Sequence, residues 1–164
     1  MRNRAQLKSH RIDTPLGPMI AIGDEEALCS LEFEDCQREP SSIVLGRNRS
    51  IDSIERELDQ YFKGQLERFV TPIKMRGTSF QEDVWSELMK IPFGKTRSYS
   101  DIAEAIENPG AVRAVGSANG ANLLTIVIPC HRVINASGKI GGYGGGLDRK
   151  EWLLQHEVKY AKRS

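Results

Sequence analysis

A cysteine and a histidine stand side by side in residues 126–133, IVIPCHRV. A thiolate is a strong nucleophile, and a neighbouring imidazole or positive charge lowers the pKa of the thiol that forms it. Cys130 and His131 therefore have the residue types of an activated cysteine nucleophile. A buried structural cysteine has the same local signature, because single cysteines are among the residues most often buried. The pair alone leaves both interpretations open.

Three β-branched residues, Ile126, Val127 and Ile128, precede Pro129 and predict a buried strand. Proline favours extended geometry at the residue before it and lacks an amide donor, so the strand should end there. The thiol and the imidazole would then follow directly off the end of a rigid strand.

The last predicted helix spans residues 147–157 and places Glu157 on the same face as Leu153 and Leu154. A carboxylate on that face would point toward the core and would need a partner. His131 is the candidate, because a carboxylate on one ring nitrogen leaves the other nitrogen free as a base.

A glycine-rich loop lies between the cysteine and this helix. In residues 141–146, five glycines surround Tyr143, and backbone without side chains allows close approach to a flat ligand. A flexible surface loop is the alternative. A phosphate cradle is disfavoured, because no Gly-Lys-Ser/Thr sequence follows.

Two short helices joined by a turn come before the cysteine. The first begins at the cap-like residues 98–101, and the second spans residues 111–118, which predicts a helix-turn-helix. The second helix consists of small residues with one charge, Arg113, whereas a major-groove reader carries several long polar side chains. It suits a narrow surface such as the minor groove, where Arg113 could enter the base stack as a wedge. Packing of this helix inside the domain is the alternative.

The first half of the chain predicts a small sheet with one helix. Strands are expected at residues 10–13, 19–22 and 27–33, followed by a polar loop over 38–50 and a helix from Ile51 to a stop at Gly64. Residues 66–77 have the character of a linker, so we place a boundary near residue 75 and predict two domains, 1–75 and 76–164. Thr78 and Gln81 predict a capping box at the start of the next helix.

The composition narrows the range of functions. A length of 164 residues fits one domain or two small ones, and a net charge of +1 means that any nucleic-acid contact must be local. Cys29, Cys36 and Cys130 are an odd number without disulfide spacing, which suits a reducing compartment, and no familiar zinc spacing predicts a metal.

No apolar run reaches about 18 residues, so no membrane span is expected. The first residues lack the apolar core of a signal peptide. We expect a cytoplasmic protein, or a nuclear one in a eukaryote.

Five motifs in order resemble the O6-alkylguanine-DNA alkyltransferase family, also called methylated-DNA–protein-cysteine methyltransferases. The resemblance is specific over about residues 78–157 and general in the first half. It implies a mixed α/β (α+β) fold with an N-terminal ribonuclease-H-like sheet domain and a C-terminal winged-helix-like helical domain that contains the helix-turn-helix. The motifs are Pro129-Cys130-His131-Arg132-Val133, Arg113-Ala114-Val115-Gly116, Asn122, Gly142-Tyr143-x-Gly145-Gly146 and Lys150-x-Trp152-Leu153-Leu154-x-x-Glu157.

The resemblance also implies roles for the catalytic residues. Cys130 would accept the alkyl group, His131 would act as its base through a water, and Glu157 would orient His131. Asn122 would steady the turn before the cysteine, and Tyr99 would protonate the guanine as it leaves.

The DNA contacts and the pocket follow from the same resemblance. Arg113 would fill the gap left by a flipped nucleotide, on a DNA-binding helix with Ala114, Gly116 and Ser117. The base edge would be read by the backbone of Cys130, Val133 and Gly144. The wall of the pocket would be formed by Tyr143 and the glycine loop, including Gly145.

The implied reaction is DNA repair by suicide methyl transfer. The O6 atom of guanine is stacked inside the duplex, so the base must flip out through the minor groove at a cost of about a few kcal/mol. No second thiol nearby and no metal would reverse the thioether, so one turnover without a cofactor is expected. The partner would be double-stranded DNA with O6-alkylguanine, O4-alkylthymine being a further candidate, bound by a monomer alone or cooperatively.

This chain departs from the usual family pattern at three positions, which bear on how well bulky alkyl groups fit. They are Leu123, Thr125 and Gly144.

Two rival functions remain at this stage. A cysteine hydrolase would use the same pair but would turn over repeatedly, although adjacent Cys and His differ from the separated pair of papain-type enzymes. A non-catalytic lesion-binding module would bind DNA without transferring a methyl group.

Overall fold

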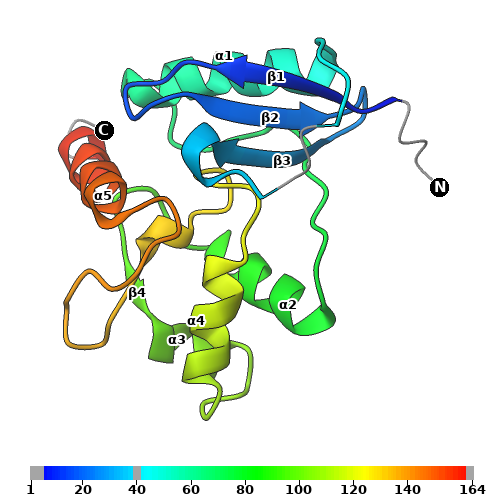
Figure 1. The fold of residues 1–164 in the computed structure, drawn as a ribbon. Coiled ribbons are helices and arrows are strands. Elements are labelled where there is room, and N and C mark those ends of the chain that lie inside the picture. Colours follow the sequence, from blue (N-terminus) through cyan, green and yellow to red (C-terminus); the bar gives the residue numbers. More distant parts are fainter. Residues whose placement is uncertain (1–5, 39–41, 162–164) are drawn as a thin grey trace. The chain divides into compact units, whose positions relative to one another are not determined.

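The computed structural model describes residues 6–38 and 42–161 (Figure 1). The chain forms two compact units. The first contains Met1–Met75 and Leu123–Thr125, and the second contains Arg76–Asn122 and Ile126–Ser164. The division of the sequence into domains 1–75 and 76–164 stays a prediction, and Leu123–Thr125 is the segment at which the two descriptions differ.

The first unit is built on a three-stranded antiparallel sheet in the order β1-β2-β3. The strands are β1 (Lys8–Ile12), β2 (Met19–Gly23) and β3 (Leu28–Phe33), close to the three predicted ranges. Helix α1 (Arg49–Phe62) covers one face of this sheet (Figure 1). A single-turn 3-10 helix, η2 (Glu34–Cys36), follows β3.

Helix α1 forms because its sequence supplies both an end signal and an apolar face. The side chain of Asn48 accepts a hydrogen bond from the amide of Ile51 at 3.1 Å and caps the helix, which begins at Arg49, two residues before the predicted start. Ile51, Ile54 and Leu58 are at most 1% exposed. Burial of each such side chain stabilises the unit by about 1.5–3 kcal/mol. Gly64 ends the helix region at φ 75°.

Segments predicted as a loop and a linker pair with the edges of the sheet. At the β1 edge, the Ser9 amide donates to the Val44 carbonyl at 2.9 Å. At the β3 edge, the Leu28 amide donates to the Pro72 carbonyl at 2.8 Å. Farther along β3, the Leu31 amide donates to the Leu123 carbonyl at 2.8 Å. Both edge strands therefore have backbone hydrogen-bond partners and do not present a bare row of N–H and C=O groups.

The second unit is mainly helical. Its helices are α2 (Ser79–Leu88), α3 (Tyr99–Ala105), α4 (Val112–Gly120) and α5 (Leu147–Ala161), and two short strands, β4 (Arg97–Ser98) and β5 (Val133–Ile134), pair in parallel. The predicted capping box of Thr78 and Gln81 is confirmed, and a second box forms between Ser98 and Asp101 at the start of α3. Helices α3 and α4 pack on each other and on α2, as a helix-turn-helix does. The expected mixed α/β architecture is thus observed.

The predicted buried strand at residues 126–128 is wrong. Ile126, Val127 and Ile128 are buried, at 1%, 4% and 1% exposure, but Ile126 adopts φ 74° and the chain turns there. The backbone pairing occurs just before, where Leu124 bridges to Leu31 of β3. The nucleophile therefore follows a tight turn and opens the 3-10 helix η3 (Cys130–Arg132), instead of following a strand end.

Within residues 6–38 and 42–161, no helix has the length and apolar character that a membrane span requires.

Candidate active site

Cys130 is held by the turn that precedes it. The Asn122 amide nitrogen Nδ2 donates to the Ile128 carbonyl at 2.9 Å and lies 3.3 Å from the Cys130 sulfur. Asn119, near the end of α4, donates to the Cys130 carbonyl at 3.2 Å. Cys130 is thus held by two asparagines, one near the end of α4 and one just after it, of which only Asn122 was predicted.

His131 and Glu157 form the predicted pair. The imidazole Nε2 lies 2.7 Å from the Glu157 oxygen Oε2, and the two side chains are 0% and 1% exposed. Burial lowers the pKa of His131, although the Glu157 carboxylate opposes that shift. The ring is therefore neutral at physiological pH. Nε2 then carries the proton and donates to Glu157, which leaves Nδ1 as an acceptor.

The acceptor nitrogen of His131 is available. Among the described residues, Nδ1 is buried and has no hydrogen-bond partner. A buried polar atom without a partner costs stability, so its presence beside a cysteine is a mark of function. The arrangement suits proton acceptance from a thiol.

Arg132 completes the network, and sequence reasoning assigned it no role. Its Nε donates to Glu157 Oε1 at 2.7 Å, its Nη2 donates to Oε2 at 3.0 Å, and its Nη1 donates to the Ile91 carbonyl at 2.6 Å. Burial alone would raise the pKa of Glu157, but the His131 ring and the Arg132 guanidinium outweigh it and hold that pKa well below its usual range. Glu157 is therefore an ionised acceptor for both partners.

Tyr99 lies at the start of α3, half-buried beside the glycine loop. A Cβ placed on Gly141 would lie 3.3 Å from the Tyr99 hydroxyl. Burial raises the pKa of Tyr99, and charge on Cys130 adds to the shift. The phenol therefore stays protonated and can act as a hydrogen-bond or proton donor.

The predicted pocket residues lie on β5 and in the glycine loop. Val133 opens β5, and the Gly146 amide donates to the Tyr143 carbonyl at 3.0 Å. The Gly145 carbonyl accepts from Arg149 of α5 at 3.1 Å. A Cβ on Gly144 would lie 3.9 Å from the Gly120 carbonyl at the end of α4. The loop is thus held by hydrogen bonds and lies near the helix that carries Asn119.

Lys150 is a second functional candidate, which belongs to the last motif but was given no role from the sequence. It is 0% exposed, and its ammonium donates to the carbonyls of Val133 at 2.6 Å and Gly142 at 3.0 Å. Burial lowers its pKa to about 8, against the opposing charge of Cys130. A signal was present in the sequence, because Lys150 precedes Glu157 by seven residues and so shares its helix face.

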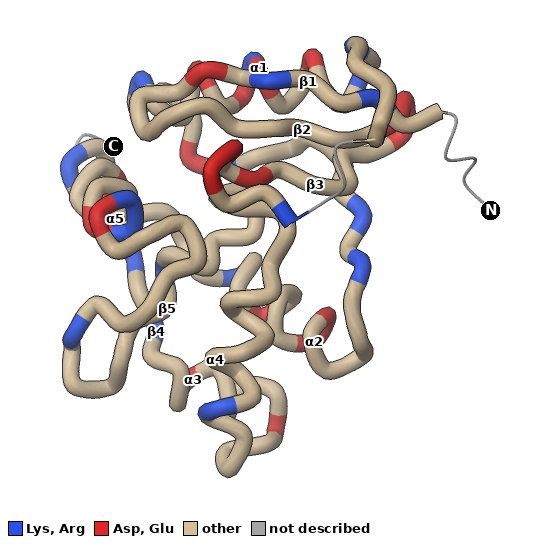
Figure 2. The backbone as a smooth tube through the Cα atoms, viewed as in Figure 1, with Lys and Arg blue, Asp and Glu red and all other residues tan. Residues whose placement is uncertain are grey.

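The proposed DNA-binding residues occupy the outer face of α4. Arg113, Ala114 and Ser117 are exposed and Gly116 is partly exposed, whereas Val115 and Ala118 are buried. The Trp85 indole of α2 donates to the Ala118 carbonyl at 2.8 Å, which fixes the inner face. The inner face of this helix is thus packed inside the unit, and its outer face is exposed, as a DNA-binding role would require. Arg113 is the one charged residue of α4, whose tube is otherwise tan in Figure 2.

Arg113 does not join the cysteine network. It lies at the first turn of α4, six residues before Asn119, which contacts Cys130. At 1.5 Å per residue, these positions are roughly 9 Å apart along the helix axis.

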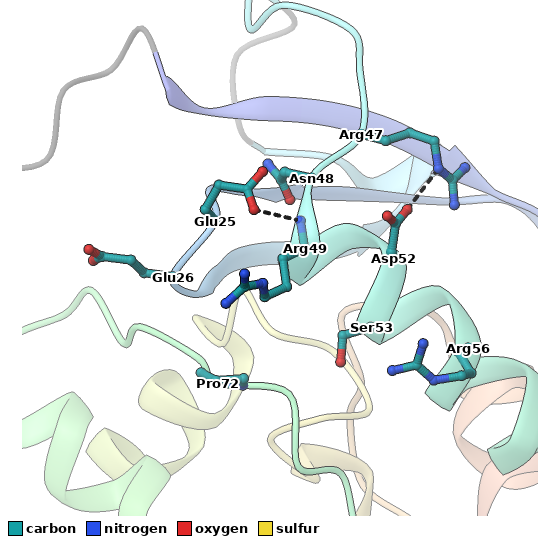
Figure 3. Close-up of a pocket in the computed structure, with 9 residues that line it drawn as sticks. All are labelled: Glu25, Glu26, Arg47, Asn48, Arg49, Asp52, Ser53, Arg56 and Pro72. Atoms are coloured by element: carbon teal, nitrogen blue, oxygen red, sulfur yellow. Dashed lines mark hydrogen bonds and ion pairs between the residues drawn. The ribbon is translucent and has the colours of Figure 1, made fainter.

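A separate hollow of about 890 Å³ lies in the first unit (Figure 3). The charges of its lining side chains cancel, because three are positive (Arg47, Arg49 and Arg56) and three are negative (Glu25, Glu26 and Asp52). Arg47 donates to Asp52 at 2.8 Å. Every predicted site residue belongs to the second unit, so this hollow contributes none of them. In the described part of the chain, no cluster of three or more His, Cys, Asp or Glu side chains could hold a metal ion.

Comparison with protein families matches almost the whole chain. Residues 7–75 match the model described as 6-O-methylguanine DNA methyltransferase, ribonuclease-like domain. Residues 79–159 match 6-O-methylguanine DNA methyltransferase, DNA binding domain.

Individual relatives agree with the family models. The methylated-DNA–protein-cysteine methyltransferase of Mycobacterium leprae is 47% identical over 147 residues, 89% of each chain. That of Methanosarcina acetivorans is 44% identical over 88% of this chain and 94% of its own. The crystal structure of Mycobacterium tuberculosis O6-methylguanine methyltransferase has a TM-score of 0.86 and 43% identity, and covers 94% of both chains. A crystal structure of Mycobacterium tuberculosis OGT in complex with DNA also has a TM-score of 0.86, with 42% identity over 94% of this chain and 93% of that one.

Proposed function

The chain belongs to the 6-O-methylguanine DNA methyltransferase family, as its motifs predicted, and from this premise we propose that it moves the alkyl group of O6-alkylguanine in DNA onto Cys130. The Cys130 sulfur attacks the alkyl carbon, a carbon–sulfur bond forms, and the bond from that carbon to O6 breaks. The guanine leaves with the electron pair. The observation that carries the proposal is the cysteine beside the buried network of His131, Glu157 and Arg132.

The proton of the thiol passes to His131. Its acceptor is Nδ1, reached through a water, because the other ring nitrogen is engaged by Glu157 at 2.7 Å. The resulting imidazolium faces an ionised carboxylate that Arg132 holds in place. Asn122 donates to the sulfur and so favours its anionic form. These contacts support nucleophilic attack by a thiolate at neutral pH.

Residues from three segments bind the guanine and protonate it as it leaves. Tyr99, whose raised pKa keeps its hydroxyl protonated, supplies a proton to the guanine as negative charge builds. The flipped base lies against the backbone of Val133 and a wall formed by Tyr143, Gly144 and Gly145. Glycine backbone suits this role because it approaches a flat purine closely.

Helix α4 binds the duplex through its exposed face. Ala114, Gly116 and Ser117 are small, so the helix backbone can approach a narrow groove, and Arg113 fills the space of the extruded nucleotide. With a net charge of +1 the protein makes few phosphate contacts. Binding is sequence-independent and salt-sensitive, and its affinity is moderate because few cations contact the phosphates.

The reaction needs one protein molecule per lesion. The product is a thioether, and the mechanism uses no group that would return Cys130 to its thiol, so each molecule acts once. It needs no cofactor, and it acts as a monomer that binds DNA alone or cooperatively. The cytoplasm suits a thiol nucleophile, and none of the three cysteines forms a disulfide in the described part of the chain.

Mass spectrometry tests this function directly. A duplex with a single O6-methylguanine, mixed in excess with the protein, is expected to add the mass of one methyl group to the peptide that contains Cys130, and the reaction then stops. Repeated turnover without modification would indicate a hydrolase. Lesion binding with an unmodified cysteine would indicate a non-catalytic DNA module.

Arg113→Ala is expected to slow methyl transfer far more than it destabilises the fold. The side chain is exposed, so the free energy of unfolding should change by about 0.5 kcal/mol or less. Loss of the wedge should reduce the single-turnover rate on duplex DNA by about 10-fold or more, because unstacking costs a few kcal/mol. On single-stranded DNA the lesion base needs no extrusion, so the same substitution should reduce the single-turnover rate much less.

Glu107→Ala provides a control for a changed charge on the exposed turn before α4. It should leave the rate on duplex DNA nearly unchanged. If Arg113→Ala transfers methyl groups from duplex DNA at the wild-type rate, Arg113 is not the wedge.

A further inference from the structure

Lys150 is a fully buried cation that none of the steps above uses. It lies in the first turn of α5, and its side chain is 0% exposed. An ammonium taken out of water costs several kcal/mol, which an apolar side chain of the same length would avoid. A residue kept at such a cost needs an explanation in its contacts.

The ammonium joins segments that are distant in sequence. It donates to the Val133 carbonyl of β5 at 2.6 Å and to the Gly142 carbonyl of the glycine loop at 3.0 Å. It also lies 5.9 Å from the centre of the Tyr99 ring of α3. Tyr99 directly follows β4, which pairs with β5 through Arg97 and Val133.

These contacts converge on the proposed base pocket. Val133, the glycine loop and Tyr99 are the parts assigned to the flipped guanine, and one ammonium contacts all three. The other hydrogen bonds given for the loop join it to itself, from the Gly146 amide to the Tyr143 carbonyl, and to α5, from Arg149 to the Gly145 carbonyl. A cation that binds one loop carbonyl and one strand carbonyl holds the two backbones at a set separation.

We propose that Lys150 is a positioning residue, whose ammonium fixes the glycine loop against β5 and so sets the wall of the lesion pocket. This inference rests on the proposed function. The titratable groups that interact electrostatically with the ammonium or its surroundings are Tyr99 of α3 and Cys130 and His131 of η3.

Lys150→Met tests the role, because methionine keeps the length and apolar stem but removes the charge and the donors. Single-turnover transfer from an O6-methylguanine duplex should slow by about 100-fold at saturating DNA, the scale expected for misplaced reacting groups, and half-saturation should need more DNA. Affinity for an unmodified duplex should stay within twofold, since the exposed face of α4 is untouched. Thermal unfolding should show that Lys150→Met stays folded at the assay temperature, although two buried carbonyls lose their donor.

The dependence on pH separates positioning from packing. Burial lowers the pKa of Lys150 to about 8, so the ammonium is present below that pH and is lost above it. The wild-type transfer rate should therefore fall above about pH 8, while Lys150→Met shows no such fall. Lys150→Arg should restore part of the rate, and that rate should not fall above pH 8, because the guanidinium does not titrate in this range.

Lys159→Met is the matched control, because Lys159 is an exposed lysine of the same helix. It should transfer at the wild-type rate. The inference is overturned if Lys150→Met transfers within twofold of the wild type, if it keeps the fall above pH 8, or if it loses transfer only in proportion to stability. A wild-type protein that gains no methyl group would instead refute the proposed function.

Discussion

Cys130→Ala is expected to abolish methyl transfer and to leave DNA binding intact. Alanine has no sulfur to accept the alkyl group, so mass spectrometry should detect no methylated protein at any protein concentration. The fold should tolerate the change, because Asn122 keeps its hydrogen bond to the Ile128 carbonyl and Asn119 keeps the carbonyl of residue 130. Fluorescence anisotropy should show unmodified-duplex affinity within about twofold of the wild type, since the exposed face of α4 is unchanged.

Cys29→Ala is a closely matched control. Cys29 and Cys130 are both 6% exposed, but Cys29 lies on β3 of the first unit, which contains none of the proposed catalytic residues. This variant should transfer one methyl group at the wild-type rate. Transfer that survives in Cys130→Ala, or a methyl group found on Cys29 or Cys36, would refute the assignment of the nucleophile.

Glu157→Gln is expected to have the largest effect on stability. It removes the negative charge that pairs with the buried Arg132 and accepts from His131, and an uncompensated buried charge costs about 3–5 kcal/mol. Urea unfolding at pH 7 should show this loss as a lower midpoint with an unchanged slope. The transfer rate of the folded fraction should also fall, because the histidine loses the partner that fixes its tautomer.

The effect of Glu157 should depend on pH in a defined direction. Its pKa in the folded protein is held well below the ordinary value of about 4.3, so its contribution is fully present above that pH and is lost as the pH falls toward the folded value. The stability gap between wild type and Glu157→Gln should therefore narrow below about pH 4. Glu151→Gln, an exposed change on the same helix, should stay within about 0.5 kcal/mol at every pH. A Glu157→Gln protein as stable as the wild type at pH 7 would contradict the network.

Local signals allowed much of the fold to be predicted. Thr78 with Gln81 is a pattern whose hydrogen bonds close within three residues, so tertiary structure need not be known to place the start of α2. The run at residues 126–128 failed for the opposite reason. β-Branched residues report burial, which is correct, but a strand also needs a partner, and the neighbouring Leu123 and Thr125 take the available groups of Leu31.

The candidate site was predictable where one residue created a need for another. A carboxylate on an apolar helix face needs a partner, which led from Glu157 to His131. Arg132 and Lys150 were part of the motifs but received no role, because charged residues are mostly exposed. Their burial depends on carbonyl groups distant in the sequence, such as those of Ile91 and Gly142. Whether a long cationic side chain turns inward is decided by tertiary structure.

The three residues Leu123–Thr125 set a limit on how far this protein can be shortened. They belong to the first unit by their pairing with β3, yet the last of them, Thr125, is only five residues upstream of the nucleophile. A fragment starting at residue 76 would leave the Thr125 amide and the Leu123 carbonyl without Leu31, and would expose Leu124, which is 2% exposed in the whole chain. A minimal repair enzyme cut from the second half would therefore need either a substitute strand or a redesigned approach to its cysteine.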